Sequence, residues 1–200
     1  MLVKKTAYYI ENFEYGGLEK FVKDLLMHSS IINDSEITVY CNAFNRRFIE
    51  ELRCAGLPSN VTVEELNIVT FAQLRTSLSY FKRGALRSIL FRSVSVTRYF
   101  LFVWNMLWLC FKLEKTDIFH VINGGYPGAD SCLAACLAAK TKGSRVIILS
   151  VLSTAYPRPK FFPFFEMFID SLIEMSVTHF HANSMAAKKA LISERRFRSE

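Results

Sequence analysis

The segment at residues 117–139, DIFHVINGGYPGADSCLAACLAA, limits the possible folds of this chain more than any other. Residues 118–122 are short, apolar and rich in β-branched side chains, which is typical of a buried strand. Residues 123–128 contain three glycines and a proline, so the backbone can turn sharply and its N–H groups stay uncovered. The small residues that follow Ala129 predict a closely packed helix. Strand, glycine loop and helix form the unit of a doubly wound sheet, in which ligands bind at the loop after the strand.

Similar units occur on both sides of this segment. An apolar stretch at residues 2–10 predicts a first strand, and a loop with Gly16 and Gly17 leads from it into an amphipathic helix at residues 18–28. We expect further strands at residues 36–41, 60–66, 145–152 and 177–182, and further helices at 45–55, 164–175 and 185–195. The sequence therefore predicts one α/β, Rossmann-like domain over residues 1–200. Its sheet would have about six mostly parallel strands, with helices on both faces.

Composition agrees with one folded α/β domain. Hydrophobic residues make up 51% of the 200 residues, which is enough for a large core. The five cysteines are odd in number and form no CxxC pair, so we expect small buried hydrophobic residues in a reducing compartment. Acidic residues and glycines arrive before any long apolar run at the N-terminus, which is unlike a signal peptide. We therefore expect a cytoplasmic protein.

The charge of the chain indicates an anionic partner. Lys and Arg number 25 against 18 acidic residues, which gives a net charge of +7. Such an excess favours phosphate-bearing ligands or an anionic membrane surface. We expect no nucleic-acid partner.

Residues 66–113 differ from the rest and are predicted to form a basic, apolar helical insertion. The segment contains no Asp or Glu, and it ends in the nearly continuous apolar run at residues 99–111. Thirteen residues are too few for a spanning helix, which needs about 20. Two interpretations stay open: a buried helix that leads into the fourth strand, or a helix in a membrane interface. In the second, residues 75–113 would contact anionic lipid, with Trp104 and Trp108 at the level of the headgroups.

Common catalytic and nucleotide-binding motifs are absent, including GxGxxG, GxxxxGK[ST], GxSxG and HExxH. His179 and His181 lie two apart on a predicted strand and so face the same side. No third ligand stands at a useful spacing, so we expect strand packing and no metal site. His120 is predicted near the mouth of the central loop, as a structural histidine or as a substrate contact.

Three segments together resemble the N-terminal half of a GT-B fold glycosyltransferase of family 4. YYIENFEYGGLEKFVKDL is similar to the Gly-Gly-x-Glu turn of that family after its first strand. DIFHVINGGYPGADSCLAACLAA with RVIILSV is similar to its strand ending in His, its acceptor loop and its next strand. SVTHFHANSMAAKKAL is similar to its last N-domain strand and the following helix. These segments cover most of the chain in the family's order and spacing.

The resemblance implies two Rossmann-like domains that face each other across a cleft, with the acceptor held by the N-terminal domain. The residues near the donor phosphates or the reacting sugar would be Gly16, Gly17 and Glu19. The residues around the acceptor would be His120, Asn123, Gly124, Gly125 and Tyr126, with Arg158 and Lys160 meeting a phosphate-bearing or lipid-linked acceptor.

The chain departs from the family in two places. Many members carry a His just after the fifth strand, where this chain has Leu152 and Ser153. The C-terminal domain that binds most of the nucleotide-sugar donor is absent from residues 1–200. The resemblance therefore implies the acceptor-binding half of a glycosyltransferase, inactive without a second domain. Its acceptor would be a cell-surface polysaccharide or glycolipid at the inner face of the cell membrane, and no cofactor is expected.

Two alternatives to an incomplete enzyme stay open. The chain could be a non-catalytic binding subunit that completes a glycosyltransferase in trans with a separate donor-binding chain. It could also be an unrelated Rossmann-like nucleotide-binding protein, although neither glycine loop fits the dinucleotide pattern.

Overall fold

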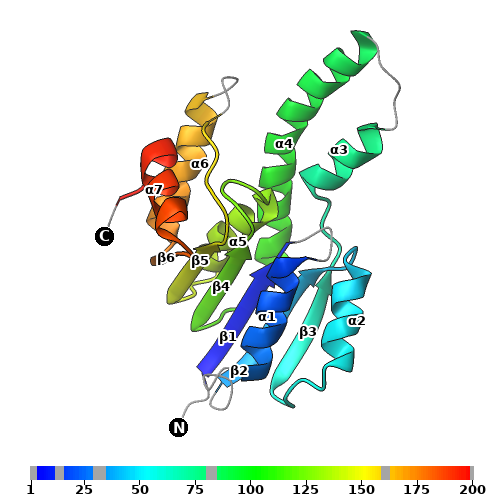
Figure 1. Cartoon of the computed structure of the whole chain (residues 1–200), viewed down its shortest axis with the longest axis vertical. Coiled ribbons are helices and arrows are strands. Elements are labelled where there is room, and N and C mark those ends of the chain that lie inside the picture. The colour runs from blue at the N-terminus through cyan, green and yellow to red at the C-terminus, as the bar shows by residue number, and fades with distance from the viewer. Residues whose placement is uncertain (1–3, 12–15, 29–34, 80–84, 159–162, 199–200) are drawn as a thin grey trace.

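A computed structural model describes residues 4–11, 16–28, 35–79, 85–158 and 163–198. Its centre is a six-stranded sheet with the order β3-β2-β1-β4-β5-β6 (Figure 1). The strands are β1 (Lys4–Ile10), β2 (Ser35–Asn42), β3 (Val61–Leu66), β4 (Ile118–Asn123), β5 (Val146–Val151) and β6 (His179–Ala182). All five pairings between them are parallel. The predicted α/β, Rossmann-like class is therefore confirmed.

The strand order reverses between β1 and β4, which are neighbours in the sheet although far apart in sequence. The chain builds outward from β1 to β3 and then returns to build outward from β4 to β6. In open parallel sheets, ligands bind at such a switch point, beyond the carboxyl ends of the two strands. The loops after β1 and β4 are the two glycine loops that the sequence singled out.

Helices cover the two faces of the sheet unequally. On one face, α1 (Gly17–His28) and α2 (Arg46–Cys54) pack on a core that includes Tyr8, Val39 and Ile122. On the other face, α4 (Ala85–Lys112), α5 (Asp130–Thr141) and α6 (Pro163–Ser176) pack on a core that includes Tyr9 and Val121. The chain also forms α3 (Phe71–Ser79) before α4, and α7 (Met185–Arg195) after β6.

Helix α5 lies between α4 and α6 and is the central helix of its face. Every residue from Ser131 to Ala139 is buried, because small side chains let α5 approach the sheet and both neighbouring helices. This is the close packing that the small-residue run predicted.

Helix α4 is much longer than the predicted apolar run, since it has 28 residues. One side of it is buried through Phe102, Asn105 and Leu109. The opposite side exposes an apolar stripe, which we call the α4 stripe and which consists of Val96, Phe100, Val103, Trp104, Leu107 and Phe111. Among the helices of the described residues, none is long and apolar enough to cross a bilayer.

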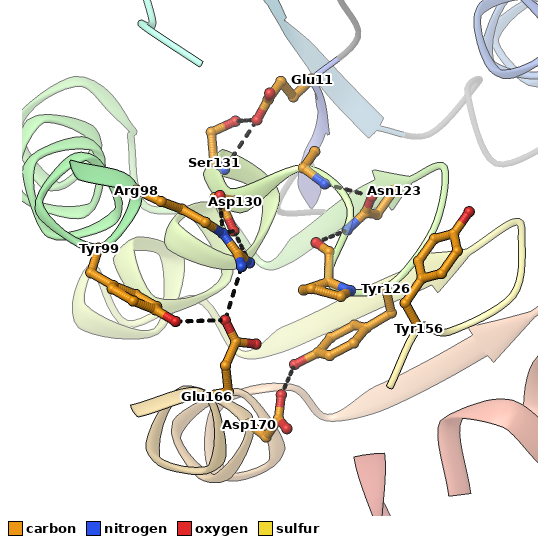
Figure 2. Close-up of polar contacts among 12 residues, drawn as sticks. Glu11, Arg98, Tyr99, Asn123, Tyr126, Asp130, Ser131, Tyr156, Glu166 and Asp170 are labelled. Carbon is orange, nitrogen blue, oxygen red and sulfur yellow. Dashed lines mark hydrogen bonds and ion pairs between the residues drawn. The ribbon is translucent and has the colours of Figure 1, made fainter. Parts of the chain in front are cut away.

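A network of buried charges connects α4, α5 and α6 (Figure 2) and extends to α7 through Arg195. Arg98 of α4 donates hydrogen bonds to Asp130 at the start of α5, the shortest at 2.6 Å, and to Glu166 of α6 at 2.9 Å. The other oxygen of Glu166 accepts from Arg195 of α7 at 2.9 Å. Glu166 therefore joins two arginines that lie 97 positions apart in the sequence.

Asp170, one turn after Glu166, extends this network. Its Oδ2 accepts from Arg158 at 2.9 Å and lies 3.4 Å from Nη1 of Arg195, while its Oδ1 accepts from the Tyr126 hydroxyl at 2.8 Å. Arg195 has no exposed side-chain surface, and its guanidinium lies 5.2 Å from the centre of the Tyr126 ring. The charged cluster thus reaches from the helices to the loop after β4.

Glu166→Gln should strongly destabilise the fold. The variant leaves Arg98 and Arg195 buried with one negative charge fewer, and unbalancing a buried ion pair typically costs about 3–5 kcal/mol. Urea unfolding at pH 7 measures this change. Glu36→Gln is the control, because Glu36 lies 3.7 Å from Lys5 with 60% of its side chain exposed, and such pairs contribute at most about 1 kcal/mol. Equal losses in the two variants would show that the network is not a main support.

Candidate functional site

A pocket of about 510 Å³ lies at the carboxyl edge of the sheet. It is formed by the start of α1, the loop after β4 and the ends of β5 and β6, and its lining residues are Gly17, Leu18, Phe21, Gly124, Leu152, His181 and Asn183. The start of α1 and the loop after β4 therefore meet in one pocket at the switch point. We call this the switch-point pocket.

The first glycine turn is held in shape by Glu19. The Gly16 N–H donates to one Glu19 oxygen at 2.8 Å, which is the reciprocal bond of a helix capping box. The other oxygen accepts from the Asn45 side chain at 3.1 Å, and Asn45 in turn caps α2 by accepting from the Phe48 N–H. Because Glu19 is fully buried, its carboxylate supports the turn from the protein interior, and neither of its oxygens is exposed to the pocket.

Gly17 is the part of this turn that faces open space. A Cβ atom built on Gly17 would meet no atom within 4 Å, whereas one built on Gly16 would lie 3.8 Å from Glu19. The backbone at the start of α1 is therefore accessible to a ligand. A helix N-terminus favours anionic groups such as phosphate.

The loop after β4 is folded around the side chain of Asn123. Its amide oxygen accepts from the N–H groups of Gly125 and Ala129, and its amide nitrogen donates to the Pro127 carbonyl at 3.3 Å. Gly128 has a φ of +43°, and a Cβ there would lie 2.1 Å from the Gly125 carbonyl oxygen, so only glycine fits. Asn123 is buried and acts as the internal support of the loop.

The other residues of this loop differ in exposure. Gly124 is exposed and lines the pocket. Gly125 is half-buried, and a Cβ on it would lie 3.4 Å from the Thr154 carbonyl oxygen. Tyr126 is fully buried, with its ring edge-on to Phe197 and its hydroxyl on Asp170. Of the acceptor residues expected in this loop, Gly124 is therefore the one that the structure places on the pocket surface.

The two expected basic contacts lie elsewhere. Arg158 is held by Asp170 and also donates to the Arg195 carbonyl at 2.5 Å, so its guanidinium belongs to the buried network. Lys160 lies outside the described residues. A phosphate at the switch-point pocket would therefore meet backbone N–H groups rather than the guanidinium of Arg158.

His120 takes part in a hydrogen-bonded chain of three side chains. Its Nε2 lies 2.7 Å from the Ser150 hydroxyl of β5, and that hydroxyl lies 3.0 Å from Nδ1 of His181 on β6. Burial and, next, the nearby His181 lower the pKa of His120 to about 4. His120 is thus neutral at physiological pH. The sequence did not indicate that Ser150 lies between His120 and His181, because it does not reveal the register between strands.

Glu11, at the end of β1, is a second titratable group beside the loops. Its carboxylate accepts hydrogen bonds from the backbone N–H of Ser131, at 3.0 Å, and from the Ser131 hydroxyl (Figure 2). Burial raises the pKa of Glu11 to about 7, and the charge of Asp130 adds to this rise against the hydrogen bonds from Ser131. Sequence reasoning placed Glu11 only as the first residue of a loop.

A metal centre has no visible basis in the described part of the chain. There, no group of three or more His, Cys, Asp or Glu side chains could hold a metal ion. His179 and His181 do face the same side of β6, as the spacing predicted.

Comparisons with known proteins bear on the fold. No protein-family model matches the chain. No curated protein matches it either. Among solved structures, the chain is similar to a Listeria monocytogenes protein described as a UDP-N-acetylglucosamine 2-epimerase, with a TM-score of 0.51 and 15% sequence identity. The match covers 97% of this chain and 43% of that protein, so the chain spans less than half of its length. The similarity supports a fold like one Rossmann-type half of a GT-B protein. It does not support glycosyltransferase family 4 in particular.

The raised pKa of Glu11 predicts a particular pH dependence of stability. The pKa of Glu11 is 4.5 in the unfolded chain and about 7 in the folded chain. Between pH 4.5 and 7, the folded chain therefore binds more protons at this residue than the unfolded chain does. As the pH rises from 4.5 to 7, Glu11 thus lowers the free energy of unfolding. The variant Glu11→Gln cannot lose that proton. We expect its stability relative to the unmodified protein to increase between pH 4.5 and 7, by about 1–3 kcal/mol in total.

Urea unfolding of both proteins at several pH values measures this difference. Subtracting the two curves removes the contribution of His120, which has the opposite sign because its lowered pKa costs stability as the pH falls below 6.5. A difference that does not change with pH would show that Glu11 titrates normally.

Proposed function

We propose that this chain is the acceptor-binding half of a GT-B-type sugar transferase that uses a nucleotide-sugar donor. The observation that carries the proposal is the switch-point pocket, in which the open turn at Gly17 meets the loop residue Gly124. Doubly wound proteins bind ligands at this place in the sheet. The likeness to a protein described as acting on a UDP-sugar supports the same class of ligand.

The two loops have different roles in this proposal. The start of α1 offers backbone N–H groups and the positive end of the helix dipole to the donor diphosphate. The loop at Gly124, with Leu152 and Asn183 beside it, holds the acceptor sugar or lipid-linked sugar. A donor-binding domain outside residues 1–200 closes over the pocket, either in the same polypeptide or as a separate chain that completes the enzyme in trans. No step of the transfer calls for a cofactor.

A second candidate function is the rearrangement of a nucleotide sugar without transfer to an acceptor. It is favoured by the likeness to the protein described as a UDP-N-acetylglucosamine 2-epimerase. Both candidates use a nucleotide sugar, and they differ in the need for an acceptor. An acceptor saccharide that binds to the chain supports transfer, whereas binding of the nucleotide sugar alone supports rearrangement.

A binding screen with Gly17→Val tests the pocket. The probes are UDP-glucose, UDP-N-acetylglucosamine, GDP-mannose and a panel of saccharides, and ligand-observed NMR on the purified chain detects weak binding. Because a Cβ at Gly17 meets open space, the variant should fold normally while its side chain occupies the pocket. We expect at least a tenfold loss of affinity, which corresponds to about 1.4 kcal/mol.

Ala72→Val is the control, since it also places a valine at an exposed position in the first turn of a helix, here α3. It should bind the probes as the unmodified chain does. Binding that survives in Gly17→Val would place the ligand elsewhere, and a chain that binds none of the probes would contradict the proposed function.

We also propose that the α4 stripe docks on the anionic inner face of the cell membrane. Its apolar side chains recur every three or four residues on one side of the helix, which is the arrangement of helices that lie in a membrane interface. Phe111 and Trp104 are 86% and 64% exposed. The chain carries a net charge of +7, and α4 ends in Lys112. Docking there would bring the pocket to a lipid-linked acceptor.

Vesicle co-sedimentation tests this docking. The chain should sediment with vesicles that contain phosphatidylserine and less with phosphatidylcholine alone, and added salt should weaken the binding. The double variant Phe100→Ser with Trp104→Ser should lose most of it. Phe44→Ser is the control, because Phe44 is 60% exposed, follows β2 and does not belong to the α4 stripe. Binding that is equal for both lipids, or that the double variant keeps, would exclude this surface.

A further inference from the structure

Three polar side chains lie in a row across β4, β5 and β6 on one face of the sheet. Ile122 is paired with Ser150, and Ser150 with His181, so these three positions point to the same side. His120 lies two residues before Ile122 and shares that side. Because Ile122 packs in the core under α1, the row His120–Ser150–His181 lies on the face that α1 and α2 partly cover.

In Figure 1 no helix covers the part of this face that carries the row, although Ser150 at its centre is fully buried. In Figure 1, α1 and α2 lie over the half of the sheet made by β1, β2 and β3, and no helix stands in front of β4 and β5. His120 and Ile148 are only half-buried, whereas Val121 and Leu149 on the other face are fully buried. His181 is exposed and lines the switch-point pocket. The row therefore runs from a sheltered histidine to a histidine on the pocket surface.

The Ser150 hydroxyl links the tautomers of the two histidine rings. A hydroxyl has one proton, so Ser150 can donate to only one of the two rings and accepts from the other. The shorter contact, 2.7 Å to His120 Nε2, fits a hydroxyl donor, and the longer one, 3.0 Å to His181 Nδ1, fits an N–H donor. In this assignment, His181 carries its proton on Nδ1 and leaves Nε2 as the nitrogen available to the pocket.

The surroundings keep His120 neutral, as this assignment requires. Burial and the neighbouring His181 lower the pKa of His120, and the Tyr8 ring of β1 lies 5.4 Å from its own ring. Among the described residues, the titratable or charged groups near His181 are His120 of β4 and His179 on its own strand. Lys188 of α7 and Arg198 after it line a pocket that His181 also lines. On the side of α1, the switch-point pocket is lined by Gly17, Leu18 and Phe21, which carry no charge.

We infer that His181 is the catalytic base of this half-site, and that Ser150 and His120 are positioning residues which hold its proton on Nδ1. The inference rests on the proposed function, a transfer from a nucleotide sugar to an acceptor hydroxyl. His181 Nε2 takes the hydroxyl proton as the acceptor oxygen bonds to the anomeric carbon. The bond from that carbon to the diphosphate breaks, and its electron pair leaves with the diphosphate. His181 then releases its proton to water.

We call the hydrogen-bonded row His120–Ser150–His181 the relay. The positions of the histidine protons test it directly. In the full chain labelled with ¹⁵N-histidine, long-range NMR at pH 8 should show His181 protonated on Nδ1. His120→Phe keeps an aromatic ring beside Tyr8 but removes the acceptor of the Ser150 hydroxyl. The hydroxyl then donates to His181, so the proton of His181 should move to Nε2. One hydrogen bond of net strength about 1.4 kcal/mol shifts the tautomer ratio roughly tenfold.

His179 is the internal control, because it is exposed on the same strand and face and should keep its tautomer. Ser150→Ala tests the same link at its centre, and thermal unfolding confirms that both variants fold. The relay is overturned if His181 carries its proton on Nε2 in the unmodified chain, or if its tautomer is the same in all three proteins.

Ligand binding separates this inference from the proposed function. A saccharide that binds in the screen should shift the Nε2 resonance of His181 and leave that of His179 unchanged, and it should bind more weakly to His181→Gln than to His179→Gln. A saccharide that binds with no effect at His181 overturns the catalytic role while the proposed function stands. If no probe binds, the proposed function and the role of base fall together, and the tautomer experiment still decides the relay.

Discussion

The pairing of buried arginines with buried carboxylates is the interaction on which half of this structure depends. Three guanidinium groups (Arg98, Arg158 and Arg195) face three carboxylates (Asp130, Glu166 and Asp170), so the cluster is balanced in charge. Buried ion pairs seldom add net stability, because desolvation offsets their attraction, but losing one partner is costly. The cluster therefore acts chiefly by fixing how the four helices α4, α5, α6 and α7 are arranged relative to one another. One guanidinium nitrogen, Nη2 of Arg195, is buried with no hydrogen-bond partner among the described residues.

This arrangement also determines the shape of the loop after β4. Asp170 of α6 binds the Tyr126 hydroxyl, and the backbone of Tyr126 accepts the Tyr156 N–H at 2.8 Å. The loop is thus anchored on one side by the charged cluster and on the other by Asn123. Gly124 lies between these anchors and faces the pocket. A site that must hold a ligand in a fixed geometry requires this kind of support from residues that the ligand never touches.

The sequence predicted the features that depend on local pattern. Alternation and periodicity located all six strands and most helices. The glycine loops were located because glycine and proline interrupt a pattern visibly. In contrast, α4 was predicted too short. Its first half mixes basic and polar residues with apolar ones, so the apolar run indicates only the second half.

Features that join distant parts of the chain could not be predicted in this way. Arg158 appeared to be a basic residue in a proline-rich loop, and only the fold brings Asp170 and the Arg195 carbonyl to it. Tyr126 stands in the loop after β4 and Glu19 in the first turn of α1, which are places where a ligand would bind, yet their side chains turn inward to buried partners. Ser150 looks like any small residue in a strand. Its position between two histidines follows from the register of three strands, which no pattern within a single strand contains.

The uneven cover of the sheet connects these observations to function. Right-handed crossovers place α1 and α2 on one face, and every crossover after β3 then lies on the other face. Within the described residues, the α1 face of β5 and β6 is therefore left without a covering helix, although Ser150 on it is fully buried. An open apolar surface at this place would bind helices or aggregate, whereas the exposed residues of this chain there include His179 and His181, with His120 half-buried beside Ile148. Hydrogen-bonding side chains beside a pocket can bind a polar ligand when it is present and water when it is not. The topology thus leaves this part of the sheet without a covering helix, and the sequence places polar side chains on it.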